Sequence, residues 1–379
     1  MRNLDLNRVP APCFVVDLEA IRNNLAVLDS VRKRTGAKIL LAQKAFSMYS
    51  VYPLLRTALD GCCASSPNEA RLAREEFGGE VHSFAAAFSD PDFQQIAEFS
   101  DHIVFNSLSQ MEHFRPEMRR LAGKISFGLR CNPEHSEAAA EIYSPCAPGS
   151  RLGIRAETMK DAVLDQIEGL HFHALCQQNA DALERTLACF EQRFAPWIPG
   201  MKWINFGGGH HITRNDYDLD LLCRIIDRFR AKYHTEVYLE PGEAVALNAG
   251  SLIGEVLDVT FNERPIAILN VSAECHMPDV LEMPYRPEIA GAGKPGEFPC
   301  LYRLAGHSCL AGDVIGDYSF PRPLKPGDRI ELLDMAIYSM VKTNTFNGLA
   351  LPSLATFDPE DSSFRIVRTF SYDDFKSRL

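Results

Sequence analysis

Short apolar runs alternate with helix-like stretches between residues 38 and 240, and this alternation is the pattern that most limits the possible folds. Helix-like stretches separate most of the runs. One of them, residues 67–74, opens with a proline, which the first turn of a helix accepts. The expected strands are the eight runs 38–44, 61–65, 81–86, 102–106, 125–130, 170–175, 203–206 and 237–240. Eight strand–helix units in succession predict an α/β fold of the (β/α)8 barrel type.

The pattern changes near residue 246, where the helical spacing of apolar residues disappears. An additional strand is expected at residues 13–16, before an amphipathic stretch at residues 18–32 that precedes the first barrel strand. The strands expected after the change are residues 251–260, 265–271, 298–304, 329–340 and 364–370. We therefore predict two domains, a barrel over residues 18–245 and a β domain formed by residues 1–17 and 246–379.

Composition narrows the classes of partner. The 379 residues include 50 acidic and 39 basic side chains, a net charge of −11, which argues against a nucleic-acid partner and suits a cationic small substrate. The 11 cysteines form no Cys-x-x-Cys pair, so we expect reduced thiols and a cytoplasmic location rather than a disulfide framework. The N-terminus lacks a signal-like apolar stretch and no run is long enough for a membrane span, so no membrane association is expected.

Four chemically coherent groups occupy the ends of the expected barrel strands, where barrel enzymes place their chemistry. Lys44 ends the first strand, His173 lies in the sixth, three glycines (residues 207–209) follow the seventh, and Glu240 ends the eighth. A lysine can form an imine with an aldehyde, glycine amides can hold a phosphate, and a carboxylate can keep a pyridine nitrogen protonated. Together these groups predict pyridoxal 5'-phosphate (PLP) as the cofactor.

Other interpretations of the same residues remain open. A lysine at a strand end often only keeps its ammonium group in water, and a glycine triplet can be only a tight turn. A metal-dependent barrel hydrolase could use His171, His173, His210, His211 and Glu240 as ligands, but it would leave Lys44 and the glycines unexplained, so no metal is predicted. A non-catalytic PLP carrier would fit those residues but not the β domain.

Several longer motifs resemble the alanine-racemase-fold, PLP-dependent decarboxylases, and the resemblance covers essentially the whole chain. The motifs shared across that family are residues 42–46 (AQKAF), 169–174 (GLHFHA), 205–210 (NFGGGH), 239–244 (LEPGEA) and 345–348 (TFNG). Residues 132–136, 145–153 and 276–285 are more diagnostic and resemble the carboxynorspermidine (carboxyspermidine) decarboxylase branch. The alternative is a sister branch that decarboxylates diaminopimelate, arginine or ornithine.

The resemblance implies roles for individual residues around the cofactor. Lys44 would bind the PLP aldehyde as an imine, His173 would stack on the ring, and Glu240 would pair with the ring nitrogen. Gly208 and Gly209 would bind the phosphate together with Tyr338 of the β domain. Arg130 would lie near the cofactor, although a structural ion pair is equally compatible with its position.

The resemblance also implies a substrate and an assembly. The branch decarboxylates carboxynorspermidine or carboxyspermidine to norspermidine or spermidine in polyamine biosynthesis. Cys309 would reprotonate the product carbon, and Cys309 and Asp313 lie in a segment that relatives donate across a homodimer interface, so shared active sites are expected. The acidic candidates for binding the cationic substrate tail are Glu274, Asp279, Glu282, Asp313 and Asp317.

Two positions depart from the family pattern. Glu243 stands where many relatives have an arginine that helps to hold the phosphate, and this weakens a diaminopimelate or ornithine assignment. Cys62 stands where relatives often have an aspartate near the lysine.

Overall fold

The computed structural model describes residues 4–139 and 141–379. The chain divides into two compact units. One unit is Asn24–Val245, and the other combines Met1–Asn23 with Ala246–Leu379.

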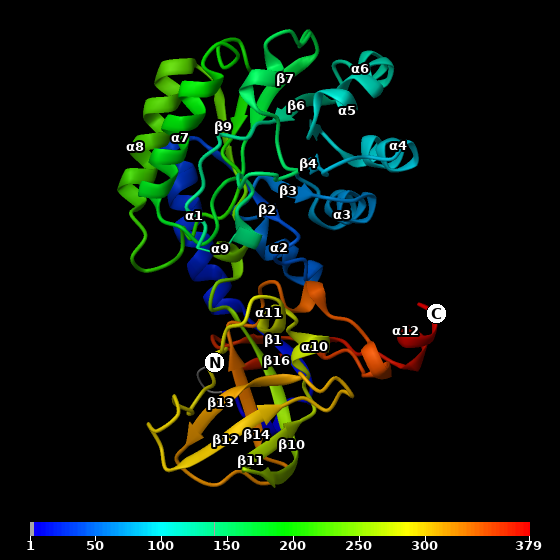
Figure 1. Cartoon of the computed structure of the whole chain (residues 1–379), viewed down its shortest axis with the longest axis vertical. Coiled ribbons are helices and arrows are strands. Elements are labelled where there is room, and N and C mark those ends of the chain that lie inside the picture. The colour runs from blue at the N-terminus through cyan, green and yellow to red at the C-terminus, as the bar shows by residue number, and fades with distance from the viewer. Residues whose placement is uncertain (1–3, 140) are drawn as a thin grey trace. The chain divides into compact units, whose positions relative to one another are not determined.

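The first unit is a closed barrel of eight parallel strands, which confirms the predicted fold class (Figure 1). Strand β9 pairs with β2 and closes the ring, with Ile39 opposite Leu239. The strands are β2 (Lys38–Ala42), β3 (Gly61–Ala64), β4 (Glu80–Phe84), β5 (His102–Phe105), β6 (Ser126–Arg130), β7 (Ile167–His171), β8 (Trp203–Asn205) and β9 (Glu236–Leu239).

Helices surround the barrel strands, and their first turns carry the expected start signals. Ser66, Ser89 and Ser107 each accept a hydrogen bond from a first-turn amide, which satisfies a donor that the helix itself leaves free. Figure 1 shows α7 and α8 side by side on the outside of the strands. The helices of this unit are α1 (Leu18–Thr35, which begins in the other unit), α2 (Tyr52–Leu55), α3 (Pro67–Leu72), α4 (Asp90–Phe99), α5 (Leu108–His113), α6 (Arg115–Leu121), α7 (Ala180–Phe194), α8 (Leu219–Tyr233) and α9 (Glu243–Ala246).

The segment between β6 and β7 departs from the regular strand–helix alternation. In its described part it carries two 3-10 turns, Glu141–Tyr143 and Ala156–Met159, in place of an α-helix. Residues 131–166 therefore form a long connection at the end of β6, the barrel end at which Arg130 lies.

Strand β7 begins at Ile167 and ends at His171, whereas the sequence pattern predicts residues 170–175. The pattern was misleading because Gly169 lies inside the strand, where glycine is usually unfavourable. Trp203 explains the glycine, since a Cβ on Gly169 would lie 2.1 Å from the indole ring and a Cβ on Gly128 would lie 2.3 Å from it. The indole thus fills the space that two side chains would otherwise take.

The second unit is built on a mixed sheet in the order β13-β12-β11-β10-β1-β15-β16, with β14 paired to β10. Its core includes Phe14, Leu252, Leu304, Tyr318 and Leu332. The strands are β1 (Cys13–Asp17), β10 (Gly250–Asn262), β11 (Arg264–Leu269), β12 (Cys300–Ala305), β13 (Val314–Phe320), β14 (Arg329–Leu333), β15 (Ser353–Asp358) and β16 (Ser363–Arg368). The helices are α10 (Ala273–His276), α11 (Asp279–Glu282) and α12 (Tyr372–Lys376).

The strand predictions for this unit were partly wrong. The strand expected at residues 329–340 ends at Leu333, because Asp334 and Tyr338 have φ values of 54° and 52°, in the left-handed region that interrupts an extended chain. Strands β13 and β15 were not predicted. In β13, Gly316 and Asp317 interrupt the apolar pattern that would mark a strand.

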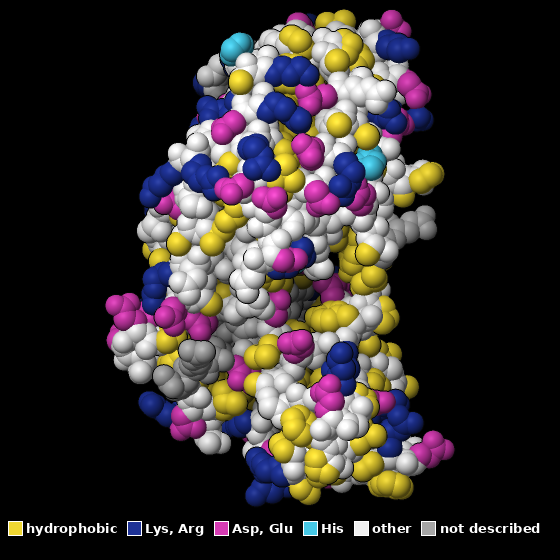
Figure 2. Space-filling view, turned by 90° about the vertical axis from the view of Figure 1, so that its left-hand side faces the viewer, with side chains coloured by type: hydrophobic (Ala, Val, Ile, Leu, Met, Phe, Trp, Pro, Cys, Tyr) yellow, Lys and Arg dark blue, Asp and Glu magenta, His cyan; other side chains and the backbone are white. Residues whose placement is uncertain are grey.

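Charged side chains of both signs are intermixed on the face shown in Figure 2, so the acidic excess does not form one continuous patch there. All eleven cysteines have free thiols. None of the helices in the described residues is long and apolar enough to cross a membrane.

Candidate active site

Lys44 lies in a turn directly after β2, at the end of the barrel where the predicted site residues meet. Its neighbour Gln43 fixes this turn, since its amide nitrogen donates to the carbonyl of Glu69 at 2.9 Å and its oxygen accepts from Tyr52 Oη at 2.9 Å. The Lys44 side chain is open to solvent but surrounded by protein atoms. Those surroundings, and next the charge of Arg130, lower its pKa. A larger neutral fraction makes an amine a better nucleophile toward an aldehyde.

Glu240 follows β9 and points its carboxylate into the same mouth. Asn205 Nδ2 donates to Oε1 at 2.6 Å, His171 Nε2 lies 3.3 Å from Oε2, and the thiol of Cys63 also donates to this carboxylate. Burial alone would raise the pKa of Glu240, but these partners and His173 hold it well below its usual range. The site therefore contains an ionised carboxylate without a Lys or Arg side chain bonded to it among the described residues.

His173 and the glycine loop form one hydrogen-bonded piece. The amide of Gly208 donates to Nδ1 of His173 at 2.8 Å. Burial, and next the charge of Lys44, lowers the pKa of His173, so its imidazole is neutral. A Cβ on Gly208 would lie 2.3 Å from the carbonyl oxygen of Glu240, and one on Gly209 would lie 1.9 Å from that of Leu175. Only glycine fits here, because the backbone of this loop passes too close to the neighbouring carbonyl groups for a side chain.

Arg130 ends β6 and is buried beside these groups. Its guanidinium lies 4.5 Å above the ring of Phe84 and donates from Nη2 to the carbonyl of His173 at 3.2 Å. Burial lowers its pKa to about 10. The structure thus brings together the barrel residues that the sequence predicts: Lys44, Arg130, His173, Gly208, Gly209 and Glu240.

In the second unit, the carboxylate of Asp313 accepts hydrogen bonds from neighbouring groups of the protein. Its carboxylate accepts from Ser272 Oγ at 2.8 Å and from the amides of Ala273 at 2.7 Å and Ser308 at 3.2 Å. With both oxygens engaged and an exposure of only 3%, Asp313 fixes the turn that carries Cys309. Its binding to the substrate tail stays a prediction.

Cys309 itself is exposed, and its amide donates to Asn347 Oδ1 at 2.6 Å. This bond joins the turn at residues 306–313 to the predicted motif at residues 345–348. Tyr338, predicted to bind phosphate, adopts a left-handed backbone with φ 52° in the chain that follows β14. The roles of Cys309 as proton donor and of Tyr338 as phosphate ligand stay predictions.

Three of the other four acidic candidates have basic neighbours. Lys342 pairs with both Asp279 and Glu282 of α11, and Asp317 pairs with Arg303 and Arg264. A substrate cation would have to share or replace Lys342 at the first pair. Glu274 is partly buried in α10, where its carbonyl accepts from Asn344 Nδ2 at 2.9 Å.

Sequence reasoning assigned no cofactor role to Cys63, His171 or Asn205, which all contact Glu240. The sequence contained a signal that could have identified two of these residues. Alternate residues of a strand point to the same side, and His171 and Asn205 precede His173 and Gly207 by two positions.

The two departures from the family pattern lie in different surroundings. Glu243 accepts from Gln177 Nε2 at 3.0 Å and lies 2.6 Å from Nε2 of the buried His211. Cys62 is fully buried, and burial, followed by the charge of Glu69, raises its pKa well above the ordinary value. It therefore behaves as a small apolar residue.

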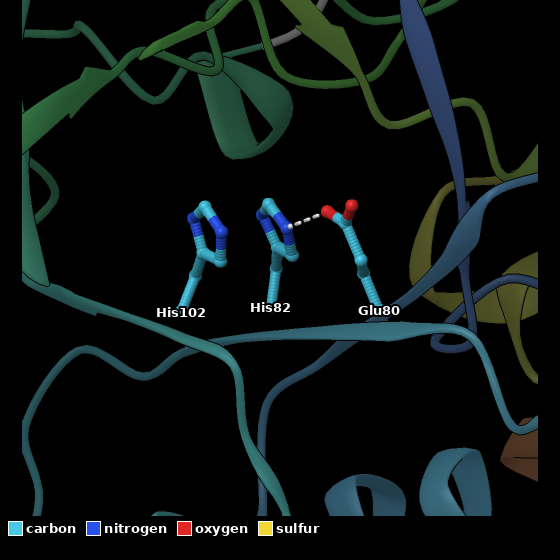
Figure 3. A group of neighbouring side chains, drawn as sticks. All are labelled: Glu80, His82 and His102. Carbon is cyan, nitrogen blue, oxygen red and sulfur yellow. Dashed lines mark hydrogen bonds and ion pairs between the residues drawn. The ribbon is translucent and has the colours of Figure 1, made fainter. Parts of the chain in front are cut away.

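Glu80, His82 and His102 form a group that could offer metal ligands (Figure 3). Glu80 and His102 begin β4 and β5, whereas Lys44 follows the last residue of β2. The two imidazoles stack with ring centroids 3.9 Å apart and planes 11° apart, and Glu80 already pairs with Lys38. A histidine ligand holds its ion close to the ring plane at about 2.0 Å, and one ion cannot lie in two parallel planes. The stack would have to break before both rings could bind one ion, so we assign no metal to this group.

The side chains and the glycine loop at the barrel mouth fit PLP. It combines a lysine of lowered pKa, a neutral imidazole, a glycine loop that excludes side chains and an anion with no Lys or Arg side chain bonded to it in the described chain. These are the groups that an aldehyde, an aromatic ring, a phosphate and a pyridinium require.

Known proteins are similar to this chain over nearly its whole length. The family described as "Pyridoxal-dependent decarboxylase, C-terminal sheet domain" matches residues 13–336. A carboxynorspermidine/carboxyspermidine decarboxylase of Campylobacter jejuni is 44% identical over 98% of this chain and 99% of its own. A carboxyaminopropylagmatine decarboxylase of Synechocystis is 42% identical over 100% of this chain and 98% of its own.

A solved structure supports the same relationship. The crystal structure of carboxynorspermidine decarboxylase from Campylobacter jejuni, complexed with norspermidine, has a TM-score of 0.90 and 42% identity, and covers 98% of this chain and 100% of its own. The resemblance inferred from the motifs is confirmed. The chain belongs to the pyridoxal-dependent decarboxylases of the alanine-racemase fold and is a decarboxylase that uses PLP.

Proposed function

We propose that this enzyme decarboxylates carboxynorspermidine or carboxyspermidine, and so forms norspermidine or spermidine in polyamine biosynthesis. The observation that carries the proposal is the 44% identity, over 98% of the chain, to a relative named for these substrates. A second relative with the same name, from Herminiimonas arsenicoxydans, is 37% identical over 98% of the chain. The norspermidine in the similar crystal structure has the chemistry of the expected product.

The barrel residues divide the work as follows. PLP, when bound, supplies an electron sink for the pair of electrons left by carbon dioxide. Lys44 binds and releases its aldehyde, His173 supports the ring face, and Glu240 holds a proton on the ring nitrogen. The amide of Gly209 would hold the phosphate, and that of Gly208 would do so in exchange for its hydrogen bond to His173 Nδ1. We retain Tyr338 as a further phosphate ligand, Arg130 as a cofactor neighbour and residues 18–245 as the PLP-binding domain.

A second candidate substrate is carboxyaminopropylagmatine, favoured by the 42% identity to the relative from Synechocystis. The two candidate substrates share the amino-acid end, so the enzyme can distinguish them only by the tail. The tail of carboxyaminopropylagmatine ends in a guanidinium, and that of the carboxylated triamines ends in an ammonium. Acidic residues of the β domain, with Glu274, Asp279, Glu282 and Asp313 as candidates, are proposed to read this tail. A charge-assisted hydrogen bond is worth about 1.5 to 3 kcal/mol, or roughly tenfold to a hundredfold in discrimination.

Parallel decarboxylation assays test the assignment. We expect kcat/KM for carboxynorspermidine or carboxyspermidine to exceed that for diaminopimelate, arginine and ornithine by at least about tenfold to a hundredfold, because only the first two present a long polycationic tail. Carbon dioxide release gives the measurement. Equal turnover of diaminopimelate or ornithine would place the enzyme in a sister branch, and a clear preference for carboxyaminopropylagmatine would favour the second candidate.

We also propose a homodimer with shared active sites, in a reducing cytoplasm that suits eleven free thiols. The thiol of Cys309 is exposed, as is required of a proton donor that must reach a substrate. Asn347 and Asp313 hold the turn that presents it.

Subunit mixing tests the shared site. Lys44→Ala and Cys309→Ala homodimers should each be inactive, and their refolded mixture should regain about a quarter of the wild-type activity. Half of the randomly formed dimers are hybrids, and one of the two sites in each hybrid is intact. Distinguishable affinity tags would show that hybrids have formed. Hybrids without activity would mean that each site is built from one chain.

A further inference from the structure

Among the described residues, the buried imidazole of His171 lies within ion-pair distance of Glu240 but makes no regular hydrogen bond. The side chain is 2% exposed, and neither ring nitrogen has a hydrogen bond of good geometry within the described chain. Nε2 nevertheless lies 3.3 Å from Oε2 of Glu240. Phe84 packs against the ring with centroids 5.8 Å apart and offers no hydrogen-bonding atom. Leaving an imidazole in this state costs free energy, so its contact with Glu240 calls for an explanation.

The contact with Glu240 favours one tautomer of the His171 ring. Burial lowers the pKa of His171, and the nearby charge of Glu240 opposes this, while Arg130 and Lys44 favour the neutral ring. A neutral imidazole has one N–H and one lone pair. The lone pair would repel a carboxylate at 3.3 Å, which favours the tautomer with the N–H on Nε2, although this N–H does not reach the geometry of a full hydrogen bond to Glu240 here.

The other oxygen of Glu240 is fixed independently. Asn205 Nδ2 donates to Oε1 at 2.6 Å, and Asn205 Oδ1 accepts the amide of Gly207 at 2.8 Å. Asn205 therefore links one carboxylate oxygen to the glycine loop through hydrogen bonds. His171, on the neighbouring strand β7, lies next to the second oxygen. Together they restrict rotation of the carboxylate and stabilise its charge.

We propose that His171 is a positioning residue for decarboxylation, which holds Oε2 of Glu240 through Nε2–H and keeps this carboxylate charged and oriented for the pyridine nitrogen of PLP. The inference rests on the proposed role of Glu240 and does not depend on the choice of substrate. His171 itself touches neither substrate nor cofactor in this role. It acts by making the carboxylate a stronger partner for a positive charge.

The test measures protonation of the ring nitrogen directly, in holoenzyme reconstituted with PLP labelled with 15N in the pyridine ring. In the wild type the 15N shift should be that of a protonated pyridine throughout the neutral pH range. In His171→Phe, which keeps an aromatic ring but has no donor, we expect the pKa of the ring nitrogen to fall by about 1 to 2 units. We expect kcat to fall about tenfold, with KM nearly unchanged.

Two variants serve as controls for this measurement. His171→Gln retains an N–H donor and should recover most of the 15N shift and of kcat. His102→Phe removes an imidazole from the other end of the barrel and should leave both unchanged. Thermal unfolding of each variant reports any general loss of stability.

The outcomes separate this inference from the role of Glu240 itself. If Glu240→Gln changes the 15N shift while His171→Phe leaves it as in the wild type, Glu240 acts alone and the inference is wrong. If neither substitution changes the shift, the proposed role of Glu240 fails first. If His171→Phe and His171→Gln are equally impaired, the imidazole acts by its shape and not as a donor.

Discussion

Substituting Lys44 with alanine should abolish the visible absorbance of enzyme-bound PLP and lower kcat by at least about 1,000-fold, while the barrel still folds. The reason is that Lys44 is the proposed attachment point for the aldehyde, in a mouth whose surroundings lower its pKa and favour the nucleophilic amine. Its side chain is open to solvent and contributes little to the core, so the free energy of unfolding of the apoprotein should change little. Absorbance spectra, single-turnover assays and thermal unfolding give the three measurements.

Two further variants make the result specific for this amine. Lys44→Arg keeps a positive charge but should remain colourless and inactive, because a guanidinium stays protonated and is not nucleophilic. Lys33→Ala removes a lysine whose side chain is 73% exposed, and it should behave as the wild type. A yellow and active Lys44→Ala enzyme would contradict the proposed site.

The second large effect is expected for Glu240→Gln. This variant should still bind PLP but decarboxylate about 10 to 1,000 times more slowly, because a neutral amide cannot stabilise a positive charge on the ring nitrogen. An opposite charge at close range shifts a pKa by about 1 to 3 units, and each unit corresponds to about tenfold. Steady-state kinetics and PLP titration of the apoenzyme separate the loss of chemistry from a loss of cofactor.

The matched control for Glu240 lies at the start of β9, the strand that Glu240 follows. Glu236 begins β9, at the end of the barrel away from Lys44, where it pairs with Lys38 at 3.4 Å. Glu236→Gln should leave turnover and PLP affinity close to the wild-type values. Turnover by Glu240→Gln at the wild-type rate would show that another group keeps the ring nitrogen protonated.

The positions of Lys44 and Glu240 could be predicted from the sequence because parallel barrel strands all end at the same face. Placement at a strand end is a local property, and apolar runs reveal it. The contacts of His171, Asn205 and Cys63 with Glu240 depend on which strands are neighbours and on side-chain rotamers, and no run of residues encodes these directly.

This difference between local pattern and long-range contact also explains the errors in the predicted strands. The predicted strand starts just after Gly169, because the reason for a glycine at this position is an indole contributed by another strand, which the local sequence does not show. In the second unit, β15 pairs in parallel with β1, which lies near the other end of the chain. Strand β13 pairs with the preceding strand β12, and its prediction failed because Gly316 and Asp317 interrupt the apolar pattern. The turn around Asp313 likewise depends on Ser272, 41 residues earlier.

The packing of Trp203 against Gly128 and Gly169 has a consequence for how this barrel could change over evolutionary time. A methyl group on either glycine would overlap the indole, and a smaller residue at position 203 would leave a void and release the hydrogen bond from Nε1 to Ser126 Oγ at 2.8 Å. Each single substitution at these positions is therefore destabilising. These three positions on three consecutive strands should drift only as a linked set in divergent lineages, while the surface helices vary independently.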